Sequence, residues 1–410
     1  MNTHSTLAPS DPMNSLDVRH AQVADMPAVH LADGRAFGEH QAPATIAIFD
    51  TLMSADDHVL AFDGDTVVGV TARMALRMTL PGGAQVDAAG ISAVSVAATH
   101  RRRGVLRQIF TTQHRELLDS GIALSALTAS EATIYGRFGY GNATVANRVD
   151  IDRRHVSFRP SAPDPGGVRQ IEADEARALL PEVHSRWQHR TPGALHRNHL
   201  WWDWQLADQP EDRAGASALF FLVHPDGYAT YRVASGERGR RADVVELAAA
   251  TDAAHAALWR VLMGLDILGT VTATVAPDDP LPFLLTDSRA VRVTNSRDGM
   301  WVRLLDVPAA LAARRYGTEL DVVAQVSNDF LGQGGRFRLR GGPDGAECTR
   351  TDAPAQVHTD VAALGSLHLG GHRARTLHRA GLLGVDDPAV LHRLDLAFGA
   401  DRAPVHGTDF

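Results

Sequence analysis

Three consecutive arginines and a glycine stand where a strand-like run of the sequence changes into a helix-like run. The stretch VSVAATHRRRGVLRQIF places Arg101, Arg102 and Arg103 directly before Gly104. The first backbone N–H groups of a helix have no partner within the helix, and the helix dipole is positive at that end. Arginine adds donors that suit phosphate, and glycine lets a bulky anion approach. The pattern indicates an anion site, although a solvated arginine run capping a surface helix would have the same composition.

The preceding strand indicates which anion is bound. In ISAVSVAAT, Val94 and Val96 alternate with small residues and leave a backbone edge along which a ligand with amide groups could lie. The pantetheine arm of coenzyme A (CoA) has such amides, and its pyrophosphate would then fall on residues 101–104. The strand edge and the basic loop together favour CoA as the ligand.

Alternating strands and helices must position this loop. The pattern predicts a strand at 16–22, helices at 24–37 and 43–53, two strands within 58–80 joined by a turn at 63–65, a strand at 85–99, a helix from Arg102 to Ser120, a strand at 122–130, a short helix at 131–138 and a last strand at 142–152. The long helix carries on one face Leu106, Ile109, Phe110, Gln113 and Leu117.

Two further segments follow a proline- and glycine-rich linker at 159–167. The first repeats the same plan, with a helix at 175–188, strands within 217–235 and 243–251, a helix at 252–266 and a strand at 270–276. The second has a helix at 307–315, strands at 321–329, 335–341, 346–351 and 355–360, and helices at 361–371 and 388–399. We therefore predict an α+β chain with mixed sheets: a flexible tail at 1–14 and domains at 15–163, 164–305 and 306–410.

The second domain has no arginine loop. Its strand-to-helix junction, ELAAATDAAHAALW, has Thr251 and Asp252 at the corresponding place. Asp252 is expected to cap the helix and to put a negative charge where a pyrophosphate would lie. We expect this copy not to bind CoA and to serve as scaffold and pocket wall.

The composition argues against several classes of protein. The net charge of -8 counts against a nucleic-acid partner. No apolar run reaches the roughly 18 residues that cross a bilayer, and the polar start has no signal-peptide core, so we expect a soluble, cytoplasmic protein without a membrane partner. Cys348 is the only cysteine, which excludes an internal disulfide and a thiolate cluster, and we expect no metal. All 40 basic residues are arginine, so no lysine is available for acylation.

At the basic loop the chain resembles the GCN5-related N-acetyltransferase (GNAT) superfamily. The acetyl-CoA motif of that superfamily reads Arg/Gln-x-x-Gly-x-Gly/Ala, and here it is Arg101-x-x-Gly104-x-Leu106, with a departure at Leu106. Longer stretches resemble the enhanced intracellular survival (Eis) family, which accepts leucine there: THRRRGVLR, LTASEATIYGRFGYG, HPDGYATYRV, LPFLLTDSR, LGSLHLGGHRA and the terminal Phe410. The likeness covers nearly the whole chain. It implies two fused GNAT-type domains followed by a sterol-carrier-like α+β domain.

The resemblance also implies roles for individual residues, with acetyl-CoA as the cosubstrate. Its pantetheine would be held by Val94, Ser95 and Val96. Its pyrophosphate would be held by Arg101, Arg102, Arg103, Gly104, Val105, Leu106 and Arg107. Ser130 and Glu131 would line the far side of the arm. Tyr135 matches the family's general acid, and Phe410 matches the residue whose α-carboxylate is the general base.

These two roles suit acetyl transfer, in which an amine loses a proton and a CoA thiolate gains one. A tyrosine with a pKa of about 10 stays protonated at neutral pH and can donate. A terminal carboxylate with a pKa of about 3.5 is a weak base, so either burial raises its pKa or it mainly positions the amine. The sequence leaves both open. Tyr135 could also be plain aromatic packing, for which Tyr140 is the nearer candidate.

By the same resemblance the acceptor amine would face Phe37, Glu39 and Phe49. Aromatic and acidic groups suit polycations through cation–π and charge attraction. Phe37 and Phe49 also lie in apolar helical runs, so ordinary helix core explains them equally well.

We therefore expect an acetyl-CoA-dependent N-acetyltransferase that modifies amines of polycationic, polyamine-type small molecules by direct transfer. The resemblance points to aminoglycosides, acetylated at several positions, with lysine side chains or polyamines as further acceptors. It also implies a homohexamer. The alternative is a non-catalytic protein that senses CoA or a lipid, and release of free thiol with any amine separates the two.

Overall fold

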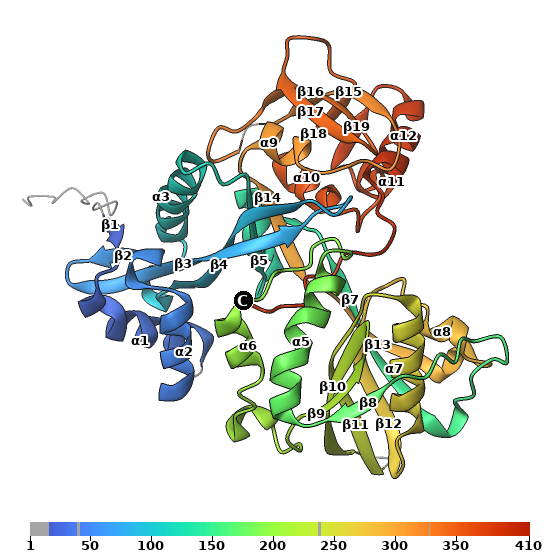
Figure 1. Ribbon diagram of the computed structural model, residues 1–410. Coiled ribbons are helices and arrows are strands. Elements are labelled where there is room, and N and C mark those ends of the chain that lie inside the picture. Colours follow the sequence, from blue (N-terminus) through green and yellow to red (C-terminus); the bar gives the residue numbers. More distant parts are fainter. Residues whose placement is uncertain (1–15, 39–41, 237–238, 328) are drawn as a thin grey trace, which may run out of the picture. The chain divides into compact units, whose positions relative to one another are not determined.

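The chain divides into two compact units. Unit 1 has the bounds Met1–Met74 and Ile91–Ser120, and unit 2 has the bounds Ala75–Gly90 and Gly121–Phe410. The computed structural model describes residues 16–38, 42–236, 239–327 and 329–410 (Figure 1). The expected tail at 1–14 and Glu39 lie outside the described residues. Strands β3 (Thr66–Thr79) and β4 (Gln85–Val96) each have residues in both units.

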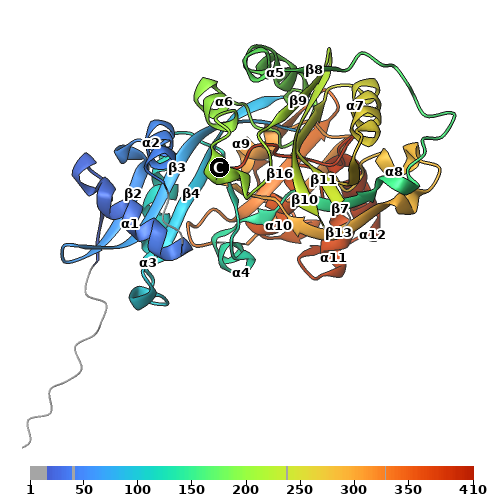
Figure 2. The ribbon, with the colours of Figure 1, turned by 90° about the horizontal axis from the view of Figure 1, so that it is seen from below.

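Unit 1 is a sheet with helices on both faces. Its other elements are β1 (Asp17–His20), α1 (Met26–Phe37), α2 (Pro43–Leu52), β2 (His58–Asp63) and α3 (Val105–Asp119). The strands follow the order β1-β2-β3-β4. A β-carbon on Gly69 would lie 2.6 Å from Val105 of α3, whereas Val70, the next residue of β3, packs in a core with Val29 of α1. Alternate residues of a strand face opposite sides, so α3 covers one face and α1 the other (Figures 1 and 2).

Helix α3 begins three residues later than the pattern predicted, and the expected start at Arg102 is wrong. Arg102 has a φ of 63° and Gly104 a φ of 82°. Both angles are left-handed and cannot continue into a right-handed helix, so the first helical residue is Val105. The buried face comprises Val105, Ile109, Phe110, Gln113, His114 and Leu117. Leu106, expected on this face, is only half-buried.

In unit 2, β4 continues into a sheet whose strands come from distant parts of the chain. It pairs in parallel with β5 (Leu124–Thr128) through Ala88–Gly90. β14 (Met300–Leu304) pairs antiparallel with both β5 and β6 (Gly141–Asn142). The short helix α4 (Ala132–Tyr135) lies between β5 and β6 in the chain. Ser130 and Glu131, which follow β5, and Tyr135, the last residue of α4, are among the residues that the family resemblance assigned to the site.

A second sheet of unit 2 has the strand order β13-β7-β12-β11-β10-β9-β8. Its strands are β7 (Val145–Asp152), β8 (Arg169–Ile171), β9 (Phe220–His224), β10 (Gly227–Gly236), β11 (Gly239–Ala249), β12 (Leu268–Val275) and β13 (Val291–Asp298). The sequence predicted 142–152 as the last strand of the first domain, whereas β7 pairs with β12 and β13. β7 and β14 therefore each pair with strands of the other predicted domain.

Two helices cover opposite faces of this second sheet (Figure 1). α5 (Ala173–Gln188) packs Leu180 in one core with Tyr228, and α7 (Asp252–Gly264) packs Leu258 in another core with Ala229. Tyr228 and Ala229 are neighbours in β10, so they face opposite sides of the sheet. The remaining helices of this region are α6 (His199–Gln205) and α8 (Leu281–Leu284).

The last part of unit 2 carries a smaller sheet in the order β17-β16-β15-β18-β19. Its elements are α9 (Val307–Ala312), β15 (Leu320–Val326), β16 (Gly335–Gly342), β17 (Gly345–Arg350), β18 (Val357–Thr359), α10 (Val361–His368), α11 (Ala374–Arg379), β19 (Leu383–Val385) and α12 (Pro388–Phe398). The predicted order of helix, sheet and helix is confirmed, while α11 and β19 were not predicted. Within the described ranges, no helix combines the length and apolar character that crossing a bilayer requires.

Candidate functional site

The arginine loop of unit 1 leads directly into an uncapped helix start. No side chain caps α3, and its first helical hydrogen bond runs from the Gln108 N–H to the Gly104 carbonyl at 3.1 Å. The N–H groups of residues 105–107 therefore have no acceptor within the helix. Arg101, Arg102 and Arg103 are exposed beside them. Free N–H donors, a helix dipole and exposed guanidinium groups can together hold a phosphate.

Gly104 meets two requirements of this loop. Its φ of 82° would cost a residue with a side chain about 1–2 kcal/mol. No heavy atom lies within 4 Å of where its β-carbon would be, so the space above the turn is open. The glycine permits the left-handed turn and leaves room for a bulky group.

The predicted pantetheine edge is the end of β4. Ser95 is buried, and Val94 and Val96 are half-buried. The residue before them, Ala93, has a φ of 50°, which is rare for a residue with a side chain and costs about 1–3 kcal/mol. This conformation interrupts the regular pleat where β4 approaches the arginine loop.

The residues expected to face the acceptor lie on α1 and α2 of unit 1. Phe37 is the last residue of α1, and 52% of its surface is exposed. Phe49 is half-buried on α2. The exposure of Phe37 is more than a helix-core residue would have, whereas Phe49 fits either interpretation.

Tyr135 ends α4 in unit 2 and is 95% buried, with 5% of its surface exposed. Burial and the charge of Glu131 raise the pKa of this phenol to about 12, against the opposing effect of a hydrogen bond with the Ser130 side chain. Ser130 and Glu131 are themselves exposed. Ser130 and Glu131 therefore both act on Tyr135, and the phenol stays protonated at neutral pH.

Tyr140 has the packing role that the sequence suggested for it. It is fully buried, and its O–H and the Ser125 hydroxyl are 2.8 Å apart. Its ring meets that of Tyr135 edge-on, with the centroids 6.3 Å apart. This contact fixes the Tyr135 ring from one side.

Phe410 lies at the paired part of β4 and β5, within unit 2. A β-carbon on Gly90 would be 2.9 Å from the Phe410 ring, so the ring packs on the glycine backbone. The Thr128 hydroxyl, at the end of β5, donates to the main-chain oxygen of Phe410 at 3.5 Å. The main-chain oxygen of Phe410 therefore lies at the end of β5.

Sequence reasoning missed residues that position Phe410. Thr128 lies in the quoted LTASEATIYGRFGYG stretch, and its place at a strand end could have singled it out. Gly90 is buried on β4 and gave no signal. Arg197 contacts the segment before Phe410 from 211 residues away in the sequence, as its bond to Thr408 illustrates, and no local pattern marks it.

The helix start of the second predicted domain differs from that of α3. Thr251 is the N-cap of α7, and its side chain accepts a hydrogen bond from the Ala254 N–H at 3.2 Å. The expectation that Asp252 is the cap is wrong, because Asp252 is already the first helical residue. Its charge still lies in the first turn. In α7, therefore, a side chain accepts from an N–H group of the first turn, whereas in α3 no capping side chain does so.

The second sheet also carries a hollow with a volume of about 700 Å³. Its lining includes Arg148, Arg241, Thr272 and Arg292 and none of the residues predicted for the site. The arginines pair with carboxylates of the same face: Arg148 and Arg241 with Asp243 at 3.5 and 2.7 Å, and Arg292 with Asp150 at 3.4 Å. These pairs are typical of a solvated strand face.

Family models match three parts of the chain. Two acetyltransferase (GNAT) domain models match residues 17–143 and 193–304, and a sterol carrier protein domain model matches residues 307–407. Two GNAT domains followed by a sterol-carrier-like domain is the architecture that the sequence predicted. The arginine loop of unit 1 and Tyr135 of unit 2 both fall in the first GNAT match.

Whole-chain relatives agree with this architecture. N-acetyltransferase Eis of Mycobacterium tuberculosis is 43% identical over 385 residues, covering 92% of this chain and 95% of the relative. An uncharacterized N-acetyltransferase of Streptomyces coelicolor is 38% identical over 387 residues, covering 90% and 94%. The crystal structure of Eis1 from Mycobacterium abscessus matches with a TM-score of 0.86 and 33% identity, covering 96% of this chain and 100% of the other. The chain belongs to the Eis family of GNAT N-acetyltransferases.

Proposed function

We propose that this N-acetyltransferase moves the acetyl group of acetyl-CoA directly to amines of polycationic small molecules, with Tyr135 and the α-carboxylate of Phe410 as the proton-handling groups. The observation that carries the proposal is the placement of the Phe410 main-chain oxygen beside Thr128, at the tip of the strand that precedes Tyr135. GNAT acetyltransferases use acetyl-CoA, and the acetyl donor follows from the family.

The residues of unit 1 supply the CoA site of this proposal. The uncapped N–H groups at 105–107 and the exposed Arg101, Arg102 and Arg103 would hold the pyrophosphate. The backbone of residues 94–96 would pair with the pantetheine amides, as an added strand pairs with a sheet edge. The family resemblance assigns the far side of the arm to Ser130 and Glu131, which belong to unit 2.

Tyr135 serves the leaving group. The amine nitrogen forms a bond to the acetyl carbon, the carbon–sulfur bond breaks, and the sulfur takes up the electron pair. With a pKa of about 12, the phenol is a proton donor throughout the neutral range. Transfer to a solvated thiolate, whose conjugate thiol has a pKa of about 8.5, would be uphill by about 5 kcal/mol. Tyr135 therefore first donates a hydrogen bond, and its proton moves as the sulfur, shielded from water, becomes more basic.

The Phe410 carboxylate serves the acceptor. Polycationic acceptors carry ammonium groups at neutral pH, and an anionic oxygen attracts and orients them. Attack needs the neutral amine, so the ammonium group first gives one proton to solvent. The carboxylate then takes the second proton, which the nitrogen loses as the carbon–nitrogen bond forms. Placing that oxygen correctly contributes more than its basicity, because a misplacement of about 1 Å can cost about 100-fold in rate.

The acceptor class follows from the family resemblance and from the charge of the groups involved. Aminoglycosides present several amines on one scaffold, and polyamines and lysine side chains present the same group. The exposed ring of Phe37 offers a face for a cation. A homohexamer, which the resemblance implies, stays a prediction that sedimentation can test.

The experiment combines an acceptor panel with a blocked terminus. Free thiol is measured with acetyl-CoA and kanamycin, spermidine or a lysine peptide, for the native chain and for a chain extended by one glycine after Phe410. We expect thiol release with at least kanamycin, and a loss of 100-fold or more in kcat on extension, with unchanged CoA affinity. Full activity of the extended chain would remove the Phe410 carboxylate from the mechanism.

A further inference from the structure

Every N–H of one buried arginine in the second GNAT domain has an acceptor. Arg197 is 4% exposed. Its Nη1 and Nη2 donate to the two carboxylate oxygens of Glu246 at 3.1 and 2.8 Å. Nη1 also reaches the Tyr228 hydroxyl at 3.5 Å, and that hydroxyl donates to Glu246 at 2.8 Å. Such a pair is fully satisfied and cannot rotate away without leaving buried charges unpaired.

The two remaining donors of Arg197 hold the segment that leads to Phe410. Nε donates to the Thr408 hydroxyl at 2.8 Å, and Nη2 donates to the Gly407 carbonyl. Thr408 is 2% exposed, so this bond lies within the core of the protein. The fork of one guanidinium therefore joins a fixed carboxylate, Glu246, to two consecutive residues near the end of the chain.

Neighbouring contacts hold the same segment against the second GNAT domain. The Val405 N–H donates to the Pro192 carbonyl at 2.9 Å, and the Leu195 N–H donates to the His406 carbonyl at 3.1 Å. At Gly407, whose φ is 69°, a β-carbon would stand 2.5 Å from the Trp187 ring. These contacts fix the course of residues 405–408 along the second GNAT domain, and no room for a side chain remains at Gly407.

We propose that Arg197 is a positioning residue, which holds Gly407 and Thr408 in register so that the α-carboxylate of Phe410 stands at the end of β5. This inference rests on the role proposed above for that carboxylate. Three residues can span at most about 10 Å, so there is little slack between Gly407 and the carboxylate. The second GNAT domain, whose own helix start is capped by Thr251, would thus contribute to acetyl transfer by locating the Phe410 carboxylate at a strand end of the first GNAT domain.

The central test is Arg197→Lys. Lysine keeps the charge opposite Glu246, but its single nitrogen cannot reach Glu246, the Gly407 carbonyl and Thr408 together. We expect kcat with kanamycin to fall at least tenfold. KM for acetyl-CoA should stay within about twofold, since no proposed CoA residue is among the partners of Arg197 described above. An unchanged kcat in a folded variant overturns the proposal.

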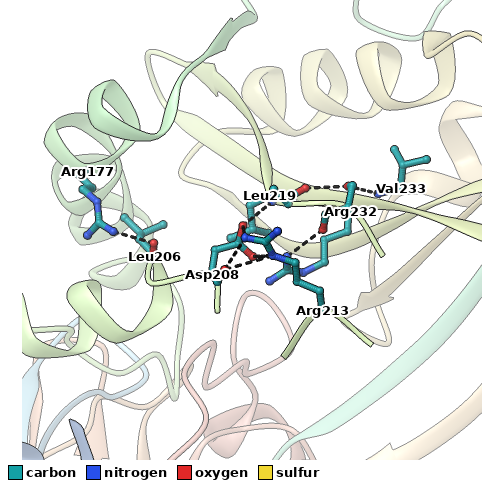
Figure 3. Close-up of polar contacts among 9 residues, drawn as sticks. Arg177, Leu206, Asp208, Arg213, Leu219, Arg232 and Val233 are labelled. Atoms are coloured by element: carbon teal, nitrogen blue, oxygen red, sulfur yellow. Dashed lines mark hydrogen bonds and ion pairs between the residues drawn. The ribbon is translucent and has the colours of Figure 1, made fainter. Parts of the chain in front are cut away.

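Arg232→Lys is the matched control (Figure 3). Arg232 belongs to the same domain and is also largely buried, and it pairs with Asp208 and donates to the Ser217 carbonyl at 3.1 Å. Asp208 accepts further bonds from the Leu219 N–H at 3.0 Å and from Arg213 at 3.3 Å. None of these partners belongs to 403–410. Both lysine variants should lose thermal stability, and only Arg197→Lys should lose kcat.

The chain extended by glycine after Phe410 separates positioning from general destabilisation. If Arg197 acts through the carboxylate, Arg197→Lys should change the kcat of the extended chain by less than about twofold. If Arg197→Lys lowers the kcat of the extended chain by the same factor as that of the native chain, the proposal is overturned. If extension alone leaves kcat unchanged, the proposed function fails. If extension lowers kcat and Arg197→Lys does not, only the positioning role fails.

Thr408→Val covers the case in which Arg197→Lys does not fold. Valine has nearly the same shape as threonine and removes only the hydroxyl that accepts from Nε of Arg197. We expect kcat to fall at least threefold, with KM for acetyl-CoA unchanged and no further loss in the extended chain. A Thr408→Val variant with native kcat overturns the positioning of the terminus by Arg197.

Discussion

The Phe410 ring lies directly on the backbone of Gly90. A β-carbon at position 90 would be 2.9 Å from the ring and 2.8 Å from the Leu76 side chain. Gly90 faces Ala126 as the last residue pair of β4 with β5. The glycine is therefore needed for space rather than for an unusual backbone angle. Because the ring can approach this closely, the Phe410 main-chain oxygen comes within reach of Thr128.

Gly90→Ala should lower kcat by displacing the Phe410 ring. Inserting a methyl group into a packed contact typically costs about 1–3 kcal/mol, and shifting a terminal residue is the easiest relief. We expect at least a fivefold loss of kcat at unchanged CoA affinity, measured by thiol release and CoA titration. Gly264→Ala is the control, because no heavy atom lies within 4 Å of its β-carbon position. Native kcat in Gly90→Ala would separate the ring contact from catalysis.

Two substitutions of Gly104 separate the need for a left-handed turn from the need for open space above the helix start. Gly104→Ala strains the left-handed turn by about 1–2 kcal/mol, and the free loop can relieve this strain by relaxing. CoA, which needs the left-handed turn, should then bind about five- to thirtyfold more weakly. Gly104→Asn tolerates the turn better, yet its side chain enters the open space above the helix start. We expect Asn to retain more thermal stability than Ala and to lose at least as much CoA affinity. Normal CoA titration of both variants would place the pyrophosphate elsewhere.

Local patterns predicted the arginine loop and the short helix at 131–138, because each depends on neighbours in the sequence, whereas the role of Tyr135 came from the family resemblance. The turn before α3 and the short helix that ends at Tyr135 are set by nearby glycines and apolar spacing. Arg197 could not be found this way, since Glu246 and Thr408 are remote in sequence and only the fold brings them together. The strand pattern likewise identified the β7 segment as extended but could not identify its sheet, which depends on β12 and β13.

Tyr135→Phe should lower kcat about 100-fold or more while KM for acetyl-CoA stays within about twofold. The raised pKa of Tyr135, about 12, keeps the phenol protonated, so the native enzyme should not lose activity through this group as the pH rises to about 10. Tyr140→Phe is the matched control. It removes the contact with Ser125 and should cost about 1–3 kcal/mol of stability at nearly native kcat. An alkaline limb near pH 9 that Tyr135→Phe abolishes would contradict the raised pKa.

Because the chain has no lysine, the change in its stability at alkaline pH depends mainly on the pKa values of its tyrosines. Burial raises the pKa of all five tyrosines above the usual value: Tyr135, Tyr140, Tyr228, Tyr231 and Tyr316. Burial also raises the pKa of the Cys348 thiol to about 12. Arg314 acts in the opposite direction, because burial lowers the pKa of its guanidinium to about 10. Among the described groups that titrate between about pH 8.5 and 11, the five tyrosines and Cys348 thus favour the folded state only while they are protonated, and Arg314 has the opposite effect.

The free energy of unfolding should therefore hold up to the pKa values of the unfolded chain and fall above about pH 9–10. Each phenol that ionises only in the unfolded chain removes about 1.4 kcal/mol per pH unit. By about pH 11 the summed loss approaches the net free energy of unfolding of a typical domain, which is roughly 5–15 kcal/mol. Denaturant unfolding across this range, followed together with phenolate absorbance, provides the test. Phenolate should form only as the protein unfolds, and its appearance in a folded chain near pH 10 would contradict the burial of these rings.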